Sequence, residues 1–428
     1  MDKISSLPDH ILSHILSFLP TKNVVATCVL STRWRYVWAS VPILEFDARL
    51  HADCYSVFNI NANKSDITFQ HFVSRVILLH DQRIQKFRLI YDCLCPYTPV
   101  HTWLRVAISE KMQELELDIG LSVHHEIFDL PKKFFTSSSL VVLKLSGIPF
   151  NIPSFVDFPN LKTLELRRIS SFDEKCIESL LSGCHALEEL VIEEISRMKP
   201  KTVYLSIETL RTFIFTYRFV VDAMVDLPYK FFINAPNLTY FHVKGCISDV
   251  FVMNTSASLD EAHIDLRQTP VSAENYIVCS QRIFKLFKGI ANAKFISFSG
   301  EVVQLLCAAS NQSLPAFSNL EQLTFGIGFD FAWKRILAEF IICSPHLEEL
   351  TLNNKEGFLK DMDELSKFAT RPLPESLRSD LKQILIEELY GSFMPEQIVY
   401  LVEHVNILKR LIINCRCPTT LRSQIGLA

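Results

Sequence analysis

The segment CHALEELVI, residues 184–192, carries the pattern that decides the fold. Its apolar side chains Leu187, Leu190 and Ile192 stand at positions i, i+3 and i+5. The last two are two residues apart, which is the period of a β-strand with one buried face. A near-copy, SPHLEELTL at residues 344–352, follows 160 residues later. We therefore expect one kind of strand that the chain builds repeatedly.

The same template recurs along most of the chain, on average about 27 residues apart, which lies within the period of leucine-rich repeats. Chance alone gives many matches in a chain that is 49% hydrophobic, so the regular spacing and the flanking turns decide. Pro159-Asn160 and Pro236-Asn237 place the same turn before a strand. The thirteen matches begin at Ile84, Met112, Leu140, Leu161, Leu187, Leu210, Leu238, Leu259, Ala293, Leu320, Leu347, Leu381 and Leu408.

Some segments between the matches have the pattern of helices. Residues 173–182 (DEKCIESLLS) and 332–343 (AWKRILAEFIIC) have apolar side chains at helical spacing, and Gly183 ends the first. Only 11 glycines in 428 residues argue against a β-sandwich rich in tight turns. We predict an α/β fold, an irregular leucine-rich-repeat solenoid with a parallel sheet on its concave side and helices or loops outside.

The first 42 residues have a different pattern, which predicts three short helices. Asp9 is a suitable N-cap, and apolar residues follow at helical spacing until Pro20 ends the run. Thr21 and Ser31 can cap two further helices. A unit of this size rarely buries enough apolar surface to be stable alone. We expect either a hydrophobic cap on the rest of the chain or a surface that docks a partner.

The residues that distinguish these two readings are Leu7-Pro8-Asp9, Ile11-Leu12, Ile15-Leu16, Phe18-Leu19-Pro20-Thr21-Lys22, Val29-Leu30-Ser31, Arg33-Trp34-Arg35 and Trp38. In this order, without a gap, they resemble an F-box of the large plant family, here a small three-helix module. The resemblance implies docking to the SKP-type adaptor of an SCF ubiquitin ligase, and through it to a cullin. The adaptor-binding residues that the resemblance implies are Leu7, Pro8, Ile11, Ile15, Leu19, Pro20 and Val24, and we expect the first five to be exposed together on one side. Trp34 and Trp38 are expected to pack inward.

The C-terminal section carries a second resemblance. It rests on Pro374-Glu-Ser-Leu-Arg-Ser-Asp-Leu381-Lys-Gln-Ile384-Leu-Ile386, Gly391, Glu396, Leu401-Val402 and Val405-Asn-Ile-Leu408-Lys-Arg-Leu411. This string is similar to the FBD region that follows the repeats in many plant F-box/LRR proteins. Its pattern alone predicts strand, loop, amphipathic helix (395–404) and strand, as in two last repeats. We divide the chain into an F-box at 1–45, repeats at 46–370, the FBD-like region at 371–415 and a tail at 416–428.

Charge and composition exclude several classes of function. The chain has 43 Lys+Arg against 47 Asp+Glu, a net charge of -4, so we expect no nucleic-acid partner. No apolar run reaches the roughly 18 residues of a membrane-spanning helix. Asp2 and Asp9 stand where a signal peptide would be basic and then apolar. We expect a soluble intracellular chain, in the cytoplasm, the nucleus or both, whose twelve scattered cysteines are reduced core thiols.

We find no pattern typical of a catalytic, cofactor or metal site. The cysteine pairs CLC (93–95) and CRC (415–417) lack the two-residue spacing of a zinc knuckle. The histidine pair at 124–125 has no carboxylate at a fixed spacing. Nucleotide-binding loops, HExxH and GxSxG are missing from the sequence. We therefore predict no cofactor, no metal and no catalytic activity of the chain's own.

The strand template also predicts which side chains point out of the core. Residues at i+2, i+4 and i+6 alternate with the buried ones and face outward on the concave side. Among them Tyr240, His242, Lys244 and His263 bring aromatic and titratable groups together, and we expect target contacts there. The other outward residues are Glu114, Glu116, Asp118, Thr163, Glu165, Arg167, Glu189, Glu193 and Glu261.

Two classes of function remain open at this point, with a third behind them. In the first, the F-box holds a ubiquitin ligase and the repeats hold an unknown protein target. In the second, the chain is a repeat scaffold for protein interactions, and its N-terminal helices only cap the solenoid. The third is a sensor of a small signal molecule, as some F-box/LRR relatives are. The F-box-like order of residues 7–38 favours the first.

Overall fold

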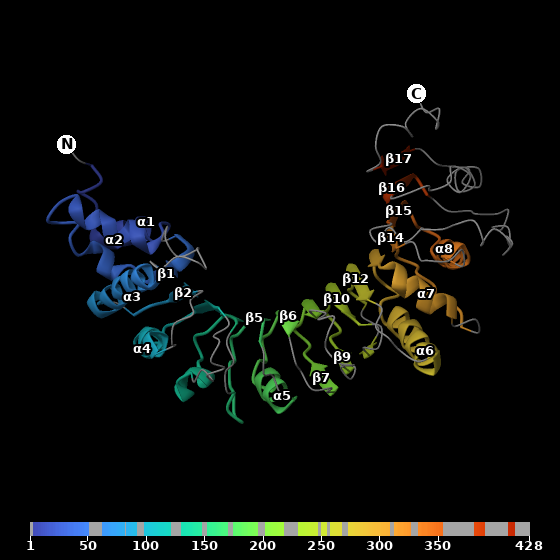
Figure 1. Cartoon of the computed structure of the whole chain (residues 1–428), viewed down its shortest axis with the longest axis horizontal. Helices are drawn as coiled ribbons and strands as arrows, with labels where there is room; N and C mark the ends of the chain where they lie inside the picture. The colour runs from blue at the N-terminus through green and yellow to red at the C-terminus, as the bar shows by residue number, and fades with distance from the viewer. Residues whose placement is uncertain are drawn as a thin grey trace. The chain divides into compact units, whose positions relative to one another are not determined.

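The chain divides into two units, Met1–Met198 and Lys199–Ala428. The computed structural model describes residues 3–50, 62–81, 83–91, 98–120, 130–147, 152–169, 174–195, 202–217, 230–246, 250–254, 257–267, 273–308, 312–326, 333–353, 381–389 and 410–415. Both units are α/β, and in both the strands run parallel with helices on one side (Figure 1). This confirms the predicted fold class.

The first unit begins with a small helical module. Helix α1 (Asp9–Leu16) and helix α2 (Thr21–Ala26) are followed by short 3-10 helices at Thr27–Val29 and Val37–Ser40. Pro8 and Pro20 occupy the N-cap positions, so Asp9 and Thr21 are the first helical residues rather than the caps that the sequence predicted. A proline there has its φ fixed near a value that suits the helix start.

After Ser31 the chain forms turns and the 3-10 helix Val37–Ser40 in place of the predicted third α-helix, and its hydrogen bonds show the tighter pattern. In an α-helix the carbonyl of Arg35 would accept from the N–H of Ala39. Here the indole Nε1 of Trp38 donates to that carbonyl at 3.0 Å, and the Ala39 N–H bonds to Tyr36 instead. The Ala39 N–H thus bonds three residues back, as in a 3-10 helix.

The rest of the first unit is a parallel sheet in strand order β1 to β6, covered on one face by helices (Figure 1). The strands are β1 (Ile43–Asp47), β2 (Lys86–Tyr91), β3 (Glu114–Ile119), β4 (Val142–Ser146), β5 (Thr163–Arg167) and β6 (Glu189–Ile195). The connections contain α3 (Ala62–Leu79), α4 (Thr98–Ala107), α5 (Glu174–Ser182) and 3-10 helices at Ala48–Leu50 and Lys132–Thr136.

The second unit continues the same design and adds a second sheet. Its main strands, in spatial order, are β8 (Thr212–Tyr217), β10 (Tyr240–Cys246), β12 (Glu261–Arg267), β13 (Phe295–Phe298), β14 (Gln322–Gly326), β15 (Glu349–Asn353), β16 (Gln383–Leu389) and β17 (Arg410–Cys415). The second sheet is β7 (Thr202–Ser206), β9 (Lys230–Asn234) and β11 (Val250–Met253), with β9 in the middle. The helices are α6 (Ala273–Gly289), α7 (Gly300–Ala308) and α8 (Trp333–Cys343).

The strand template is confirmed at every predicted position, because a main-sheet strand begins two residues after each of the thirteen matches. The helices predicted at 173–182 and 332–343 are confirmed as α5 and α8. The template also fits β1 through Val41, Leu44 and Phe46, a repeat that our sequence analysis missed. The helix predicted at 395–404 lies outside the described residues.

Burial confirms the predicted register of the strands. Leu164, Leu166, Phe241 and Val243 are at most 1% exposed, while the alternate residues face outward. We call the side of each sheet that carries the outward residues, opposite the helices, its open face. The core between the two sheets of the second unit contains aromatic side chains. There the ring centroids of Phe231 and Phe215 lie 4.7 Å apart.

The strands β7, β9 and β11 were not predicted. They occupy the side of the second unit on which helices lie in the other repeats (Figure 1). Only five residues separate β7 from β8, too few for a helical return, so the chain crosses as a strand. Among the described residues, none of the helices has both the length and the apolar character to cross a membrane.

Candidate functional site

The helical module presents an apolar surface of the kind that its sequence predicted. Ile11 and Ile15 on α1 and Leu19 after it are 37%, 43% and 42% exposed. Leu12 and Leu16, about 100° around α1 from Ile11 and Ile15, are at most 2% exposed and belong to the core of the module. Helix α1 therefore has two apolar faces. One packs into the core of the module, and the other stays exposed and can bind a partner.

The remaining predicted adaptor contacts differ in exposure. Pro8 and Pro20 are exposed and Leu7 is half-buried. Val24 is only 2% exposed and so is not part of the exposed surface, while its contact with an adaptor stays a prediction. The reason for its burial is the direction of α2, which packs against β1 and the 3-10 helix Val37–Ser40 and turns Val24 into that contact.

The two tryptophans pack inward as expected, at 7% and 8% exposure. The indole Nε1 of Trp34 donates to Ser5 Oγ at 2.8 Å. The guanidinium of Arg33 donates to the backbone carbonyls of Ser5 and Leu7, and its Nη2 lies 3.2 Å from Asp9 Oδ1. These bonds hold the segment that leads into α1 against the turns, and they fix the position of Leu7.

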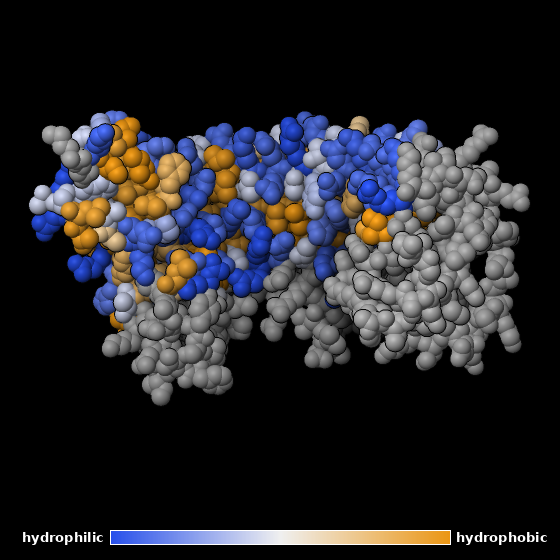
Figure 2. All heavy atoms as spheres, turned by 90° about the horizontal axis from the view of Figure 1, so that it is seen from above, coloured by the Kyte–Doolittle hydropathy of each residue, from blue (hydrophilic) through white to orange (hydrophobic). Residues whose placement is uncertain are grey.

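Several exposed apolar side chains belong to the same module but were not among the predicted contacts. Phe18 is 76% exposed, and its ring lies 5.2 Å from that of His14. The others stand before α1 or in the turns after α2, and their apolar character outside the helices was the signal that could have identified them. They are Ile4, Val29, Leu30 and Tyr36, each more than half exposed. Figure 2 shows orange, hydrophobic surface at the end of the molecule where α1 and α2 lie in Figure 1.

The open face of the first unit is a ladder of ion pairs between neighbouring strands. Lys86 Nζ lies 3.0 Å from Glu45 and 3.5 Å from Glu114. Burial alone would lower the pKa of Lys86, but hydrogen bonds and charges from these two carboxylates raise it. Further pairs join Arg88 to Glu116, Lys144 to Glu165, Arg167 to Glu165 and Glu193, and Arg168 to Asp118. Most predicted outward acids of this unit are thus neutralised by their neighbours.

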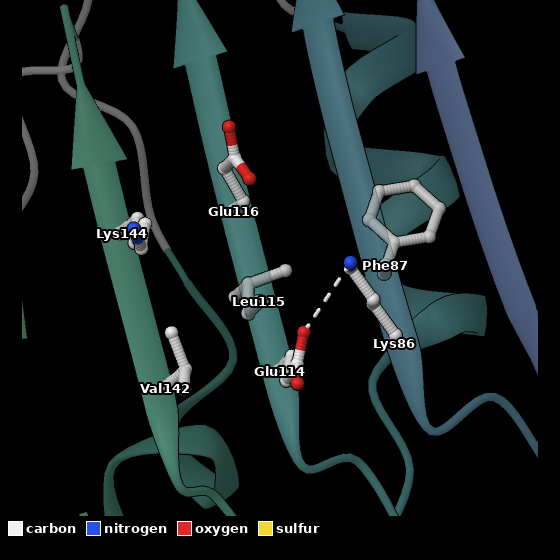
Figure 3. A pocket seen from close by; sticks show the side chains of 7 residues that line it. All are labelled: Lys86, Phe87, Glu114, Leu115, Glu116, Val142 and Lys144. Atoms are coloured by element: carbon white, nitrogen blue, oxygen red, sulfur yellow. Dashed lines mark ion pairs between the residues drawn. The ribbon is translucent and has the colours of Figure 1, made fainter. Parts of the chain in front are cut away.

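A small hollow lies on this ladder between β2, β3 and β4 (Figure 3). Its volume is about 150 Å³, and its polar lining consists of Lys86, Glu114, Glu116 and Lys144. Pockets for small molecules usually have roughly 300–1,000 Å³ and a mainly apolar lining. The lining charges are also already paired, as the dashed line in Figure 3 shows for Lys86 and Glu114. This hollow therefore gives no support to a sensor of small molecules.

The predicted target contacts of the second unit come together on its open face. The rings of His242 and His263, opposite each other on β10 and β12, lie 5.5 Å apart, and the ring of Tyr240 lies 5.4 Å from His263. Lys244 Nζ pairs with Asp265 at 3.0 Å. Phe295 on β13, which sequence analysis missed, extends the cluster at 5.0 Å from His263.

The cluster shifts the pKa values of two of its members. Burial lowers the pKa of His242, and the neighbouring His263 and Lys244 add to this, while Asp265 opposes it. Burial also raises the pKa of Tyr240, as does the negative charge of Glu261. Both shifts favour the neutral forms of the His242 and Tyr240 side chains. Neutral rings suit contacts with an apolar or π-stacking partner.

Thiols and metal ligands give no further site within the described residues. Cys28, Cys184, Cys246, Cys279, Cys307 and Cys343 are thiols rather than halves of disulfides, and burial raises the pKa of Cys184 to about 12. No group of three or more His, Cys, Asp or Glu in this part of the chain could hold a metal ion. The predicted pairs at 93–95 and 415–417 and the histidines at 124–125 lie outside the described side chains.

Comparison with protein families identifies both parts of the chain. The model of the F-box domain matches residues 4–46, the helical module together with nearly all of β1. The model described as "FBD-associated F-box protein At5g56370, LRR repeats" matches residues 100–253, from α4 to β11. The fold and the exposed surface of the module thus define a class of protein in which an F-box is followed directly by leucine-rich repeats.

Similar proteins come from Arabidopsis thaliana. The "Putative F-box protein At1g58310" is 33% identical, over 82% of this chain and 73% of that protein. The "F-box/LRR-repeat protein 13" is 30% identical, over 96% of this chain and 89% of that protein. The "F-box/FBD/LRR-repeat protein At5g22700" is 30% identical over 90% of this chain and 85% of that protein, which supports the FBD-like region. The chain belongs to the plant F-box/LRR-repeat family.

Proposed function

We propose that this protein is the substrate-recognition subunit of an SCF-type ubiquitin ligase. The F-box domain is in general the module that binds an SKP-type adaptor, and F-box/LRR proteins are typically non-catalytic. In this proposal the module at residues 4–46 binds the adaptor and through it a cullin. The open face of the repeats binds a protein target. Other subunits transfer the ubiquitin, and this chain contributes proximity by raising the effective concentration of the target at the ligase.

The observation that carries the proposal is the exposed apolar surface of the module. Ile11, Ile15 and Leu19 stay in contact with water although the module has a buried core of its own. Exposing such side chains is unfavourable unless a partner covers them. Leu7 and Pro8 lie at the start of α1, where the Arg33 bonds position them.

Each region then has a stated role. The adaptor contacts are Leu7, Pro8, Ile11, Ile15, Leu19 and Pro20, with Val24 in the module core behind them. The target contacts are Tyr240, His242, Lys244 and His263. We infer a working place inside the cell, in the cytoplasm, the nucleus or both, because ubiquitin ligases of this type act there.

The double variant Leu7→Ala/Pro8→Ala tests the proposal. We expect it to lose adaptor binding in a pull-down with the purified adaptor. Its cooperative unfolding should stay nearly unchanged, because both side chains lie far from the repeats and distant effects are usually independent. If adaptor binding persists and the melting temperature falls, the ubiquitin-ligase function is wrong.

A scaffold without ligase function is the alternative, and one contact favours it. The side-chain hydroxyl of Thr21 accepts a hydrogen bond from the backbone N–H of Glu45 at 2.7 Å, so α2 is bonded to the first strand. Terminal repeats need such caps. The scaffold alternative predicts the reverse result for the same double variant. The repeats would unfold at a lower temperature, and no partner binding would be lost.

A further inference from the structure

On the open face of the second unit, an acidic residue lies between two aromatic residues. The parallel register places Tyr240 of β10 opposite Glu261 of β12, and Glu261 opposite Phe295 of β13. The three side chains therefore occupy the same outward position on adjacent strands. Glu261 is 52% exposed, and both rings are half-buried.

Glu261 differs from its acidic neighbours in how its charge is paired. Asp265, two residues later, has the ammonium of Lys244 at 3.0 Å, and Asp260 has that of Lys294 at 2.7 Å. Within the described residues, the ion-pair partner of Glu261 is His263, with Nε2 3.4 Å from Oε2. A histidine carries a charge only when it is protonated. Glu261 thus remains available to a cation from outside.

The ion-pair ladder of the first unit provides the contrast. There, Lys86 lies between Glu45 and Glu114, and Arg88 lies 3.0 Å from Glu116. A foreign cation on that ladder would have to displace a lysine or arginine that is already paired. At Glu261 it would displace the imidazole of His263, which lies 3.4 Å from the carboxylate, with its ring 5.4 Å from that of Tyr240 and 5.0 Å from that of Phe295, and which is no permanent cation.

We propose that the row Tyr240, Glu261 and Phe295 binds an arginine side chain of the protein target. This inference rests on the proposed function and names the chemistry of its partner. A guanidinium is planar, so it can stack on an aromatic ring while its N–H groups donate to a carboxylate. A lysine ammonium satisfies the carboxylate but stacks less well. The charge and the flanking rings thus select arginine.

The test uses the full chain in complex with its adaptor and a library of random peptides. We expect the captured peptides to be enriched in arginine over lysine. The best peptide is then measured by fluorescence anisotropy beside its citrulline analogue, which keeps the shape of arginine but lacks its charge. We expect the arginine peptide to bind roughly five- to thirtyfold more tightly, from one stacked, partly exposed ion pair.

Matched variants assign this preference to the row. Glu261→Gln and Phe295→Ala should each reduce it to about twofold or less, with unchanged cooperative unfolding for the first. The control is Glu349→Gln, at the same outward position of β15, where the neighbouring strands present Gln322 and Gln383 instead of rings. It should keep the full preference.

Three results would overturn the inference. They are equal binding of the arginine and citrulline peptides, capture of acidic peptides or of none, and an arginine preference that Glu349→Gln removes as well. The adaptor pull-down on the same preparation tests the proposed function separately. Adaptor binding without an arginine preference rejects this inference alone, whereas absence of adaptor binding by the unaltered chain rejects the proposed function.

Discussion

Helix α1 allows the adaptor surface and the module core to be perturbed separately within one turn. Ile11→Ala/Ile15→Ala removes two side chains that are 37% and 43% exposed. Burying a whole side chain of this size contributes about 1.5–3 kcal/mol, and somewhat less than half of each remains to be buried by a partner. We expect adaptor affinity to fall about five- to thirtyfold. The free energy of unfolding should fall by about 2–3 kcal/mol, because the larger part of each side chain is already buried within the module.

The matched variant is Leu12→Ala/Leu16→Ala, on the neighbouring, buried face of the same helix. These leucines are 0% and 2% exposed, and each truncation costs about 2–5 kcal/mol of stability. We expect this variant to unfold the module at lower urea concentration. Calorimetric titration with the purified adaptor and urea unfolding, followed by circular dichroism, measure the two effects. If the exposed pair leaves the affinity unchanged while destabilising the module, the surface is a structural cap and the reasoning fails.

Three further predictions concern the second unit and the thiols. Phe231→Ala should cost about 3–5 kcal/mol of unfolding free energy, because the ring is 1% exposed between the two sheets. Phe232→Ala, on the outer side of the same strand, should cost clearly less. Equal losses in the two variants would contradict the assigned register. Because the folded pKa of His242 is lowered, its contribution to stability is present above about pH 6.5 and is lost as the pH falls through the folded pKa. His242→Gln should therefore reduce the fall in melting temperature from about pH 7.5 to 5.5, and an identical fall in both proteins would refute this. Chelator and reducing agent should leave the melting temperature unchanged, since the thiols are expected to be core side chains such as Cys184; a lower value with chelator would indicate metal ligands.

The main sheet could be predicted from sequence because each of its strands buries one face. The alternation around Leu164 and Phe241 is a local signal, and each strand begins at a fixed distance from the match. The outer strand β9 followed no such template. Its position depends on the number of residues between it and the next strand of the main sheet. That number is set by the whole repeat and not by the residues of β9 themselves.

The candidate sites were predictable where exposure follows from local pattern. Ile11 and Ile15 belong to the amphipathic pattern of α1, whereas the burial of Val24 depends on how α2 packs against β1. The row containing Glu261 needs more information still. The template places Tyr240, Glu261 and Phe295 two residues after three successive matches, but only the fold shows that Glu261 pairs with a histidine while Asp265 and Asp260 pair with lysines.

The strict register of the parallel strands has a consequence for how this protein can diverge. One residue inserted into a strand such as β10 would exchange its open-face side chains with buried ones such as Phe241, which a folded repeat cannot accept. Residues added between strands do no such harm. The 34-residue interval from Leu259 to Ala293 accommodates the long helix α6 and still returns β13 in register with β12. If the open face binds the target, as proposed, new specificities arise by substitution on that face while the connections between strands change in length.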